Sequence, residues 1–275
     1  MSLNSVNTNV GAMMALESLS AINAQLGETL NHISTGLKIS SPKDNPAVWA
    51  MAQNERAEVS SLDAVTSSLQ RGQSIVDVAM SAGQSISDLL TQMKQKALAA
   101  SALDPSDPSR QSLNDDYVAL RKQIDTMASS ADFDGVNLIS AGGTGQVRAL
   151  ANTKGTDTID VAHVDLSTSG ALLSGLRSDL LGTMSATDIS DLGTAISRVD
   201  GAVAKLGTGS NALDTHMTFV GKLQDTLQAS IGNMVDADMA EESAKLQALQ
   251  VRQQLAMMAL QIANQAPSML LQLFR

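Results

Sequence analysis

The most regular pattern in this chain is a row of apolar residues at helical spacing near each end. Near the N-terminus these residues are three, four or seven positions apart, as on one face of a helix. We therefore predict a helix from about Ser5 to Ile33, and the same spacing returns from Leu246 to the C-terminus. The residues expected to make contacts between copies of the chain are Leu3, Val6, Val10, Leu19, Leu26, Leu30, Ile33, Leu246, Leu249, Leu255, Ile262, Leu270 and Leu273.

Both terminal segments are almost free of charge. The first 36 residues carry only Glu17 and Glu28, and the last 30 carry only Arg252 and Arg275. Because a solvated helix face normally carries charge, we expect both helices to be covered on most sides. The simpler alternative is a helix pair inside a monomer, but apolar faces of this extent favour an interface.

The next region has ordinary helix boundaries. Thr35–Gly36 ends the first helix, because glycine suits the left-handed conformation just after a helix. Residues 40–44 are predicted to form a loop, with Asn45 as the N-cap and Pro46 as the first residue of the next helix. The helix continues to about Leu69. Arg71–Gly72 is a candidate bend, after which a second helix or a continuation runs from Ser74 to Ala100.

Asp104–Pro108 is a firm break, with Asp107 as cap and Pro108 opening a further helix. That helix stops at Asp132–Gly135. Its apolar face is spaced four, three, four and three: Leu113, Tyr117, Leu120, Ile124 and Met127.

The apolar period changes in the middle of the chain. Residues 146–151 and 158–166 alternate, which predicts a small antiparallel β-hairpin, whereas 167–185 fit no pattern. Helical spacing returns at Thr187 or Asp188, resumes after Gly207–Gly209 and runs on into the C-terminal segment. The fold class is therefore mainly α: a long antiparallel helical bundle or coiled coil with a small β-hairpin region in the middle.

Composition supports helices packed side by side. Only 2% of the 275 residues are aromatic, against 43% hydrophobic, so the core must consist of Ala, Leu, Ile, Val and Met. The net charge of −10 disfavours nucleic acid and anionic membrane as partners. No stretch is apolar enough to span a membrane, and the N-terminus does not resemble a signal peptide.

We expect no catalytic, cofactor-binding or metal site and no enzyme activity. The chain has no cysteine, which excludes thiol nucleophiles and thiolate metal ligands. His32, His163 and His216 lie in different segments and are predicted to be structural. Adjacent carboxylates such as Glu241–Glu242 point to different sides of a helix and are predicted to be solvated, and Met257–Met258 to serve in packing.

Five short motifs lie along the chain, in this order: Leu3–Asn9, Ile33–Ile39 with Ser41–Ala47, Phe133–Ile139, Asp236–Ser243, and Ala263–Pro267 with Leu270–Arg275. These motifs and their order resemble those of bacterial flagellins, in the style of α-proteobacteria. The resemblance covers nearly the whole chain apart from about 167–185. It implies an extracellular structural subunit that polymerises into the flagellar filament for motility.

The resemblance also implies which residues form each part of the subunit and which proteins it binds. Residues 1–40 and 237–275 would form the two halves of an inner-core coiled coil. Residues 41–135 and 186–236 would form an outer helical domain, with the hairpin and its connection at 136–185. The partners would be further copies of the chain and other flagellins, the hook–filament junction and filament cap proteins, and an export chaperone at the C-terminal segment. The alternative is a hook–filament junction adaptor, which shares both terminal helices.

The lack of cysteine, the lack of a signal peptide and the uncovered terminal helices suggest a route of assembly. The hypothesis is export of the unfolded chain through the hollow filament, with folding at its tip. Terminal segments that order only in the polymer would couple folding to assembly.

Overall fold

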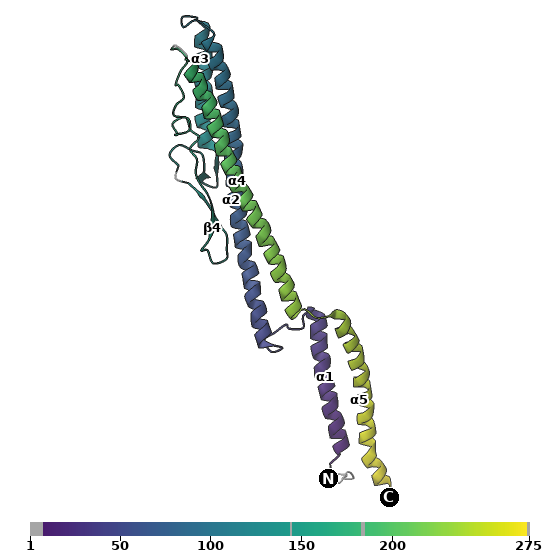
Figure 1. The fold of residues 1–275 in the computed structure, drawn as a ribbon. Helices are drawn as coiled ribbons and strands as arrows, with labels where there is room; N and C mark the ends of the chain where they lie inside the picture. The colour runs from purple at the N-terminus through teal and green to yellow at the C-terminus, as the bar shows by residue number, and fades with distance from the viewer. Residues whose placement is uncertain (1–7, 144, 183–184, 274–275) are drawn as a thin grey trace. The chain divides into compact units, whose positions relative to one another are not determined.

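The computed structural model describes residues 8–143, 145–182 and 185–273, with side chains described as far as residue 265 (Figure 1). Long helices dominate it, as predicted. The helices are α1 Val10–Thr35, α2 Pro46–Ser101, α3 Ser109–Ser130, α4 Ala186–Val235 and α5 Met239–Leu273. The strands are β1 Asp132–Phe133, β2 Val136–Asn137, β3 Val147–Leu150 and β4 Thr158–Val161.

The chain divides into two compact units. The terminal unit consists of Met1–Ala57 with Thr226–Arg275, and the central unit consists of Glu58–Asp225. Within the terminal unit, α1 and α5 lie side by side (Figure 1). The central unit contains α3, both hairpins, residues 58–101 of α2 and residues 186–225 of α4.

Helix ends follow the local chemistry of the sequence. Gly36 closes α1 in the left-handed conformation, with φ of 72°, and its N–H donates to the carbonyl of His32 at 2.8 Å. Asn45 caps α2 by accepting the N–H of Val48 at 3.1 Å. The first helix thus ends, and the second begins, where the sequence predicts.

The interruption predicted at Gly207–Gly209 is absent from α4, whereas at Arg71–Gly72, where a second helix or a continuation was expected, the continuation of α2 is confirmed. A Cβ atom on Gly72 would lie 3.0 Å from Val147, and one on Gly209 would lie 2.8 Å from Val161. These glycines therefore allow the β3–β4 hairpin to approach both helices closely rather than bending the chain.

A further prediction fails near the C-terminus, where α4 does not run on into α5. The helix ends at Val235, and Asp238 begins α5 by accepting the N–H groups of Ala240 and Glu241 at 2.8 and 3.2 Å. The start of α4 also differs, because Ser185 rather than Thr187 or Asp188 is its cap. Ser185 and Asp188 bond each other's backbone N–H in a capping box.

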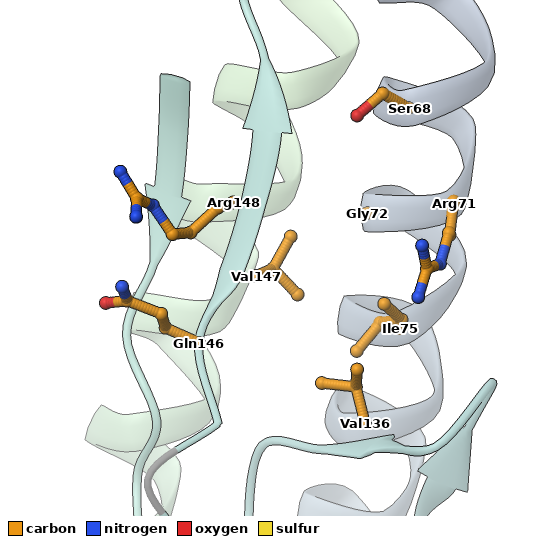
Figure 2. A pocket seen from close by; sticks show the side chains of 8 residues that line it. All are labelled: Ser68, Arg71, Gly72, Ile75, Val136, Gln146, Val147 and Arg148. Atoms are coloured by element: carbon orange, nitrogen blue, oxygen red, sulfur yellow. The ribbon is translucent and has the colours of Figure 1, made fainter. Parts of the chain in front are cut away.

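The predicted hairpin is present as β3 and β4, paired antiparallel from Val147 opposite Val161 to Leu150 opposite Thr158. Its inner face packs on α2 beside a hollow of about 220 Å³, where Figure 2 shows Val147 next to Ile75. A second, tighter hairpin joins β1 and β2. Its turn, Asp134–Gly135, has positive φ at both residues, which a type I′ turn requires.

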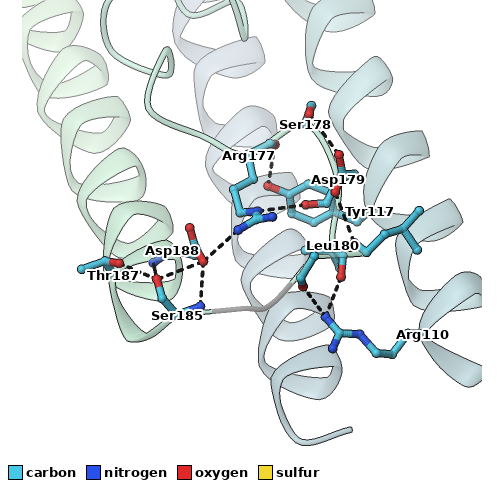
Figure 3. Close-up of polar contacts among 11 residues, drawn as sticks. Arg110, Tyr117, Arg177, Ser178, Asp179, Leu180, Ser185, Thr187 and Asp188 are labelled. Atoms are coloured by element: carbon cyan, nitrogen blue, oxygen red, sulfur yellow. Dashed lines mark hydrogen bonds and ion pairs between the residues drawn. The ribbon is translucent and has the colours of Figure 1, made fainter. Parts of the chain in front are cut away.

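The segment without a sequence pattern is held to α3 by polar contacts (Figure 3). Arg110, which is only 3% exposed, donates from Nη2 to the carbonyls of Leu180 and Gly182, both at 2.7 Å. The Tyr117 hydroxyl donates to the carbonyl of Arg177 at 3.1 Å. These long-range bonds replace the regular backbone pairing that this segment lacks.

The central unit has a continuous apolar core. The fully buried side chains include Leu69, Leu90, Ile124, Leu138 and Leu206, from both long helices, α3 and the hairpin region. Side-chain hydrogen bonds between α2 and α4 add to it. Ser87 donates to Asp200 at 2.7 Å, and Gln224 donates to Asp63 at 2.8 Å.

Candidate assembly surface

The terminal unit contains the two segments that the sequence predicts to act between molecules. Asn9 begins α1 and accepts the N–H of Ala12 through its side-chain oxygen at 3.0 Å. The amide nitrogen of the same side chain donates to the carbonyl of Ala263 in α5 at 2.7 Å. One residue therefore caps one terminal helix and ties it to the other.

At the other end of the pair, the chain segments that leave α1 and enter α5 bond to each other. Leu37 and Asp236 form an antiparallel bridge. Lys38 N–H donates to the carbonyl of Val235 at 2.7 Å, and Ala237 N–H donates to that of Gly36 at 2.9 Å. These backbone bonds set the antiparallel register of the two helices.

A buried polar pair lies close to this junction. His32 Nδ1 and Glu242 Oε1 are 3.2 Å apart, and the two residues are 4% and 8% exposed. Burial raises the pKa of Glu242, but hydrogen bonding from His32 and the positive charge of Lys245 outweigh it and hold the pKa below its usual value. The prediction that Glu242 is a solvated charge is therefore wrong, because the antiparallel register brings α1 over it.

Farther along the pair the two helices stay in contact, but few side chains are fully buried between them. Gln253 donates to the side-chain oxygen of Asn23 at 2.7 Å. Leu249 is 3% exposed and is the one hydrophobic residue with described side chain that is buried on α1 or α5. Thr29, His32 and Glu242 are the buried polar residues of the two helices over the same described range. The two helices therefore bury little of their apolar surface against each other.

Most exposed large hydrophobic side chains of the described residues lie on these two helices. On α1 they are Val10, Met13, Met14, Leu16 and Leu30, and on α5 they are Met239, Val251, Leu255, Met257, Met258 and Ile262. Ile262 is 70% exposed and Met14 is 64% exposed. A soluble monomer rarely exposes so much contiguous apolar surface, which marks an interaction site.

The thirteen residues predicted from the sequence separate into groups. Val10, Leu30, Leu255 and Ile262 are exposed, whereas Leu19, Leu26, Ile33 and Leu246 are half-buried and Leu249 is buried. Leu3 and Val6 lie outside the described residues, and Leu270 and Leu273 lie in α5 but beyond the described side chains. The predicted set did not include Met13, Met14, Leu16, Val251, Met257 and Met258, all of which are exposed.

The described residues were also searched for a metal site and for a membrane-spanning helix. They contain no cluster of three or more His, Asp or Glu side chains that could hold a metal ion. No helix among them is long and apolar enough to cross a membrane. The exposed apolar surface of α1 and α5 is therefore the main candidate for function.

Comparison with known proteins identifies the family of this chain. The family described as the bacterial flagellin N-terminal helical region matches residues 6–144, and the bacterial flagellin C-terminal helical region matches residues 189–274. The chain belongs to the bacterial flagellin family. The two matches include the described parts of α1 and α5, so the candidate surface lies in regions that characterise the family.

The sequences of several flagellins are similar to this chain along most of its length. Flagellin FljM and flagellin FljK of Caulobacter vibrioides are 49% and 47% identical to it, each over 85% of this chain and 85% of the relative. A flagellin of Brucella melitensis is 33% identical, over 83% and 84% of the two chains. The protein is thus a short flagellin of the α-proteobacterial type and a structural filament subunit, not an enzyme. A hook–filament junction adaptor is not favoured.

Proposed function

We propose that the α1–α5 pair is the surface through which copies of this chain assemble into an extracellular flagellar filament. The observation that supports it is the set of exposed apolar side chains on both helices. Leu3, Val6, Leu270 and Leu273 extend the same sequence pattern and belong to the proposed surface. Burying such side chains between subunits supplies the main driving force for association.

The proposal assigns different positions in the filament to different parts of the chain. Residues 1–40 and 237–275 form the coiled coil of the inner core, and 41–135 and 186–236 form the outer helical domain with the hairpin region 136–185. The low charge of the terminal segments supports this assignment, because unpaired charges are costly inside a polymer. The filament cap, the hook–filament junction proteins and an export chaperone at the C-terminal segment are the further partners.

Seeded polymerisation tests the assembly surface. Purified monomer is added to short filament seeds, and elongation is followed by sedimentation and negative-stain electron microscopy. We expect wild-type protein to form long tubular filaments. Ile262→Asp places a charge where a 70% exposed apolar side chain now lies, and should abolish elongation while the helix content of the monomer stays unchanged.

Leu249→Ala provides the matched comparison on the same helix. Leu249 is buried between α1 and α5, so its truncation should weaken the pair within the monomer. Normal elongation by Ile262→Asp would contradict the proposed surface. Wild-type monomer that never elongates verified seeds would instead favour the junction adaptor.

A further inference from the structure

Four exposed methionines lie at one level of the α1–α5 pair. Met13 and Met14 on α1 are 62% and 64% exposed, and Met257 and Met258 on α5 are 46% and 50% exposed. The antiparallel register places all four between the Asn9–Ala263 and Asn23–Gln253 contacts. We call these four residues the methionine band.

Methionine carries all of the sulfur in this protein. The chain has 14 methionines and no cysteine. A peroxide oxidises a thioether much as it oxidises a thiol, but methionine sulfoxide is restored by dedicated reductases. Exposure decides which thioethers react: Met93 is completely buried in the central unit, whereas the methionine band is open to solvent.

The band also forms part of the proposed assembly surface. Methionine is flexible and polarizable, so it can fill irregular gaps between packed helices. The sulfoxide is polar and bears an oxygen that accepts hydrogen bonds, which an apolar interface cannot satisfy. One chemical change at these positions therefore acts on the surface that builds the filament.

We propose that the methionine band is a reversible oxidation site that controls whether the free subunit can assemble. Hydrogen peroxide transfers one oxygen atom to each sulfur: the S–O bond forms, the O–O bond breaks, and the peroxide leaves as water. The sulfur loses two electrons, and a thiol-driven sulfoxide reductase returns them. Oxidised subunit stays folded but does not join the filament, and subunits already assembled are protected. This inference rests on the proposed function of the α1–α5 pair.

The test uses full-length protein treated with hydrogen peroxide until peptide mass mapping shows one added oxygen on each band methionine. We expect unchanged helix content and a rate of seeded elongation lowered by more than about tenfold, because several apolar contacts become polar. Treatment with sulfoxide reductases and dithiothreitol should restore elongation. The variant with Met13, Met14, Met257 and Met258 all replaced by leucine should elongate equally well before and after peroxide.

Met51→Leu is the matched control, because Met51 is 56% exposed but lies on α2, outside both the band and the proposed surface. This control should lose elongation after peroxide as the wild type does. Full elongation by oxidised wild type, or continued sensitivity of the four-leucine variant, would overturn the inference and leave the proposed function intact. Failure of untreated wild type to elongate seeds would instead reject the proposed function itself, and the inference with it.

Discussion

The terminal helix pair and the central unit contain similar apolar residues but differ in how far they bury them. The central unit encloses Leu69, Leu90 and Ile124 completely, whereas most apolar side chains of α1 and α5 remain exposed or half-buried. The pair is held at specific points instead, by Asn9 at one end and the His32–Glu242 contact near the other. The comparison shows a chain with one unit that completes its own core and another that leaves apolar side chains exposed, as the proposed assembly through this surface requires.

The largest expected contrast is between a buried and an exposed leucine. Leu90→Ala removes a completely buried side chain from the central unit and should lower the free energy of unfolding by about 2–5 kcal/mol. Leu255→Ala removes a 55% exposed side chain from α5 and should change monomer stability by less than about 0.5 kcal/mol. Urea unfolding of monomers, followed by circular dichroism, measures both.

The same two variants separate stability from assembly. Leu255→Ala should slow seeded elongation although its monomer is intact, while Leu90→Ala that remains folded should elongate at close to the wild-type rate. Equal losses of monomer stability in the two variants would show that α5 is packed as tightly as the central unit, and the comparison would fail.

The next contrast compares two arginines of the central unit. Arg110 is 3% exposed and satisfies two backbone carbonyls, so Arg110→Ala should destabilise this unit by about 2–4 kcal/mol. The guanidinium of Arg148 is well exposed and lies 3.5 Å from Asp160, and Arg148→Ala should cost less than about 1 kcal/mol. Amide hydrogen exchange of residues 167–182 shows where the unit is destabilised. Exchange there should become faster in the Arg110 variant and stay unchanged in the Arg148 variant. Unchanged exchange there in the Arg110 variant would show that other contacts hold the segment.

The sequence predicts features set by neighbouring residues and misses those set by distant ones. The end of α1 at Gly36 and the cap at Asn45 depend on local backbone chemistry and were predicted correctly. Gly209 was interpreted as part of an interruption and Gly72 as part of a candidate bend, because their partners, Val161 and Val147, are far away in the sequence. Turn propensity is a weak guide where tertiary packing decides.

The exposure of apolar side chains on the terminal helices was predictable in kind but not residue by residue. Apolar spacing identifies both terminal helices, yet it cannot separate the face that meets the other helix from the face left exposed. Leu249 and Leu255 are equivalent in the sequence pattern, but one is 3% and the other 55% exposed. The His32–Glu242 contact joins positions 210 residues apart, so local spacing carried no sign of it.

The smallest expected effect concerns pH and the terminal pair alone. The folded-state pKa of Glu242 lies below the usual value of 4.5, so the fold favours its carboxylate form. That contribution is present above about pH 4.5 and is lost as the pH falls through the lowered pKa. The groups around the carboxylate are His32 of α1 and Lys245 of α5, with Asp238 and Glu241 lining the same hollow. We expect this loss to be smaller than those above, because the burial of Glu242 opposes the interactions that lower its pKa.

Glu242→Gln isolates this contribution, because it keeps the shape of the side chain and removes its titration. Amide hydrogen exchange of α1 and α5, measured from pH 6 to pH 3 and corrected for intrinsic exchange rates, should show a steeper loss of protection in wild type than in the variant. Amides of α3 should respond equally in both proteins, since none of the bonds of Glu242 reaches that helix. Parallel pH profiles for α1 and α5 in the two proteins would mean that the buried pair does not hold the terminal helices together. In that case the backbone bonds at Gly36–Lys38 and Val235–Ala237, together with the Asn9–Ala263 and Asn23–Gln253 contacts, would have to fix their register.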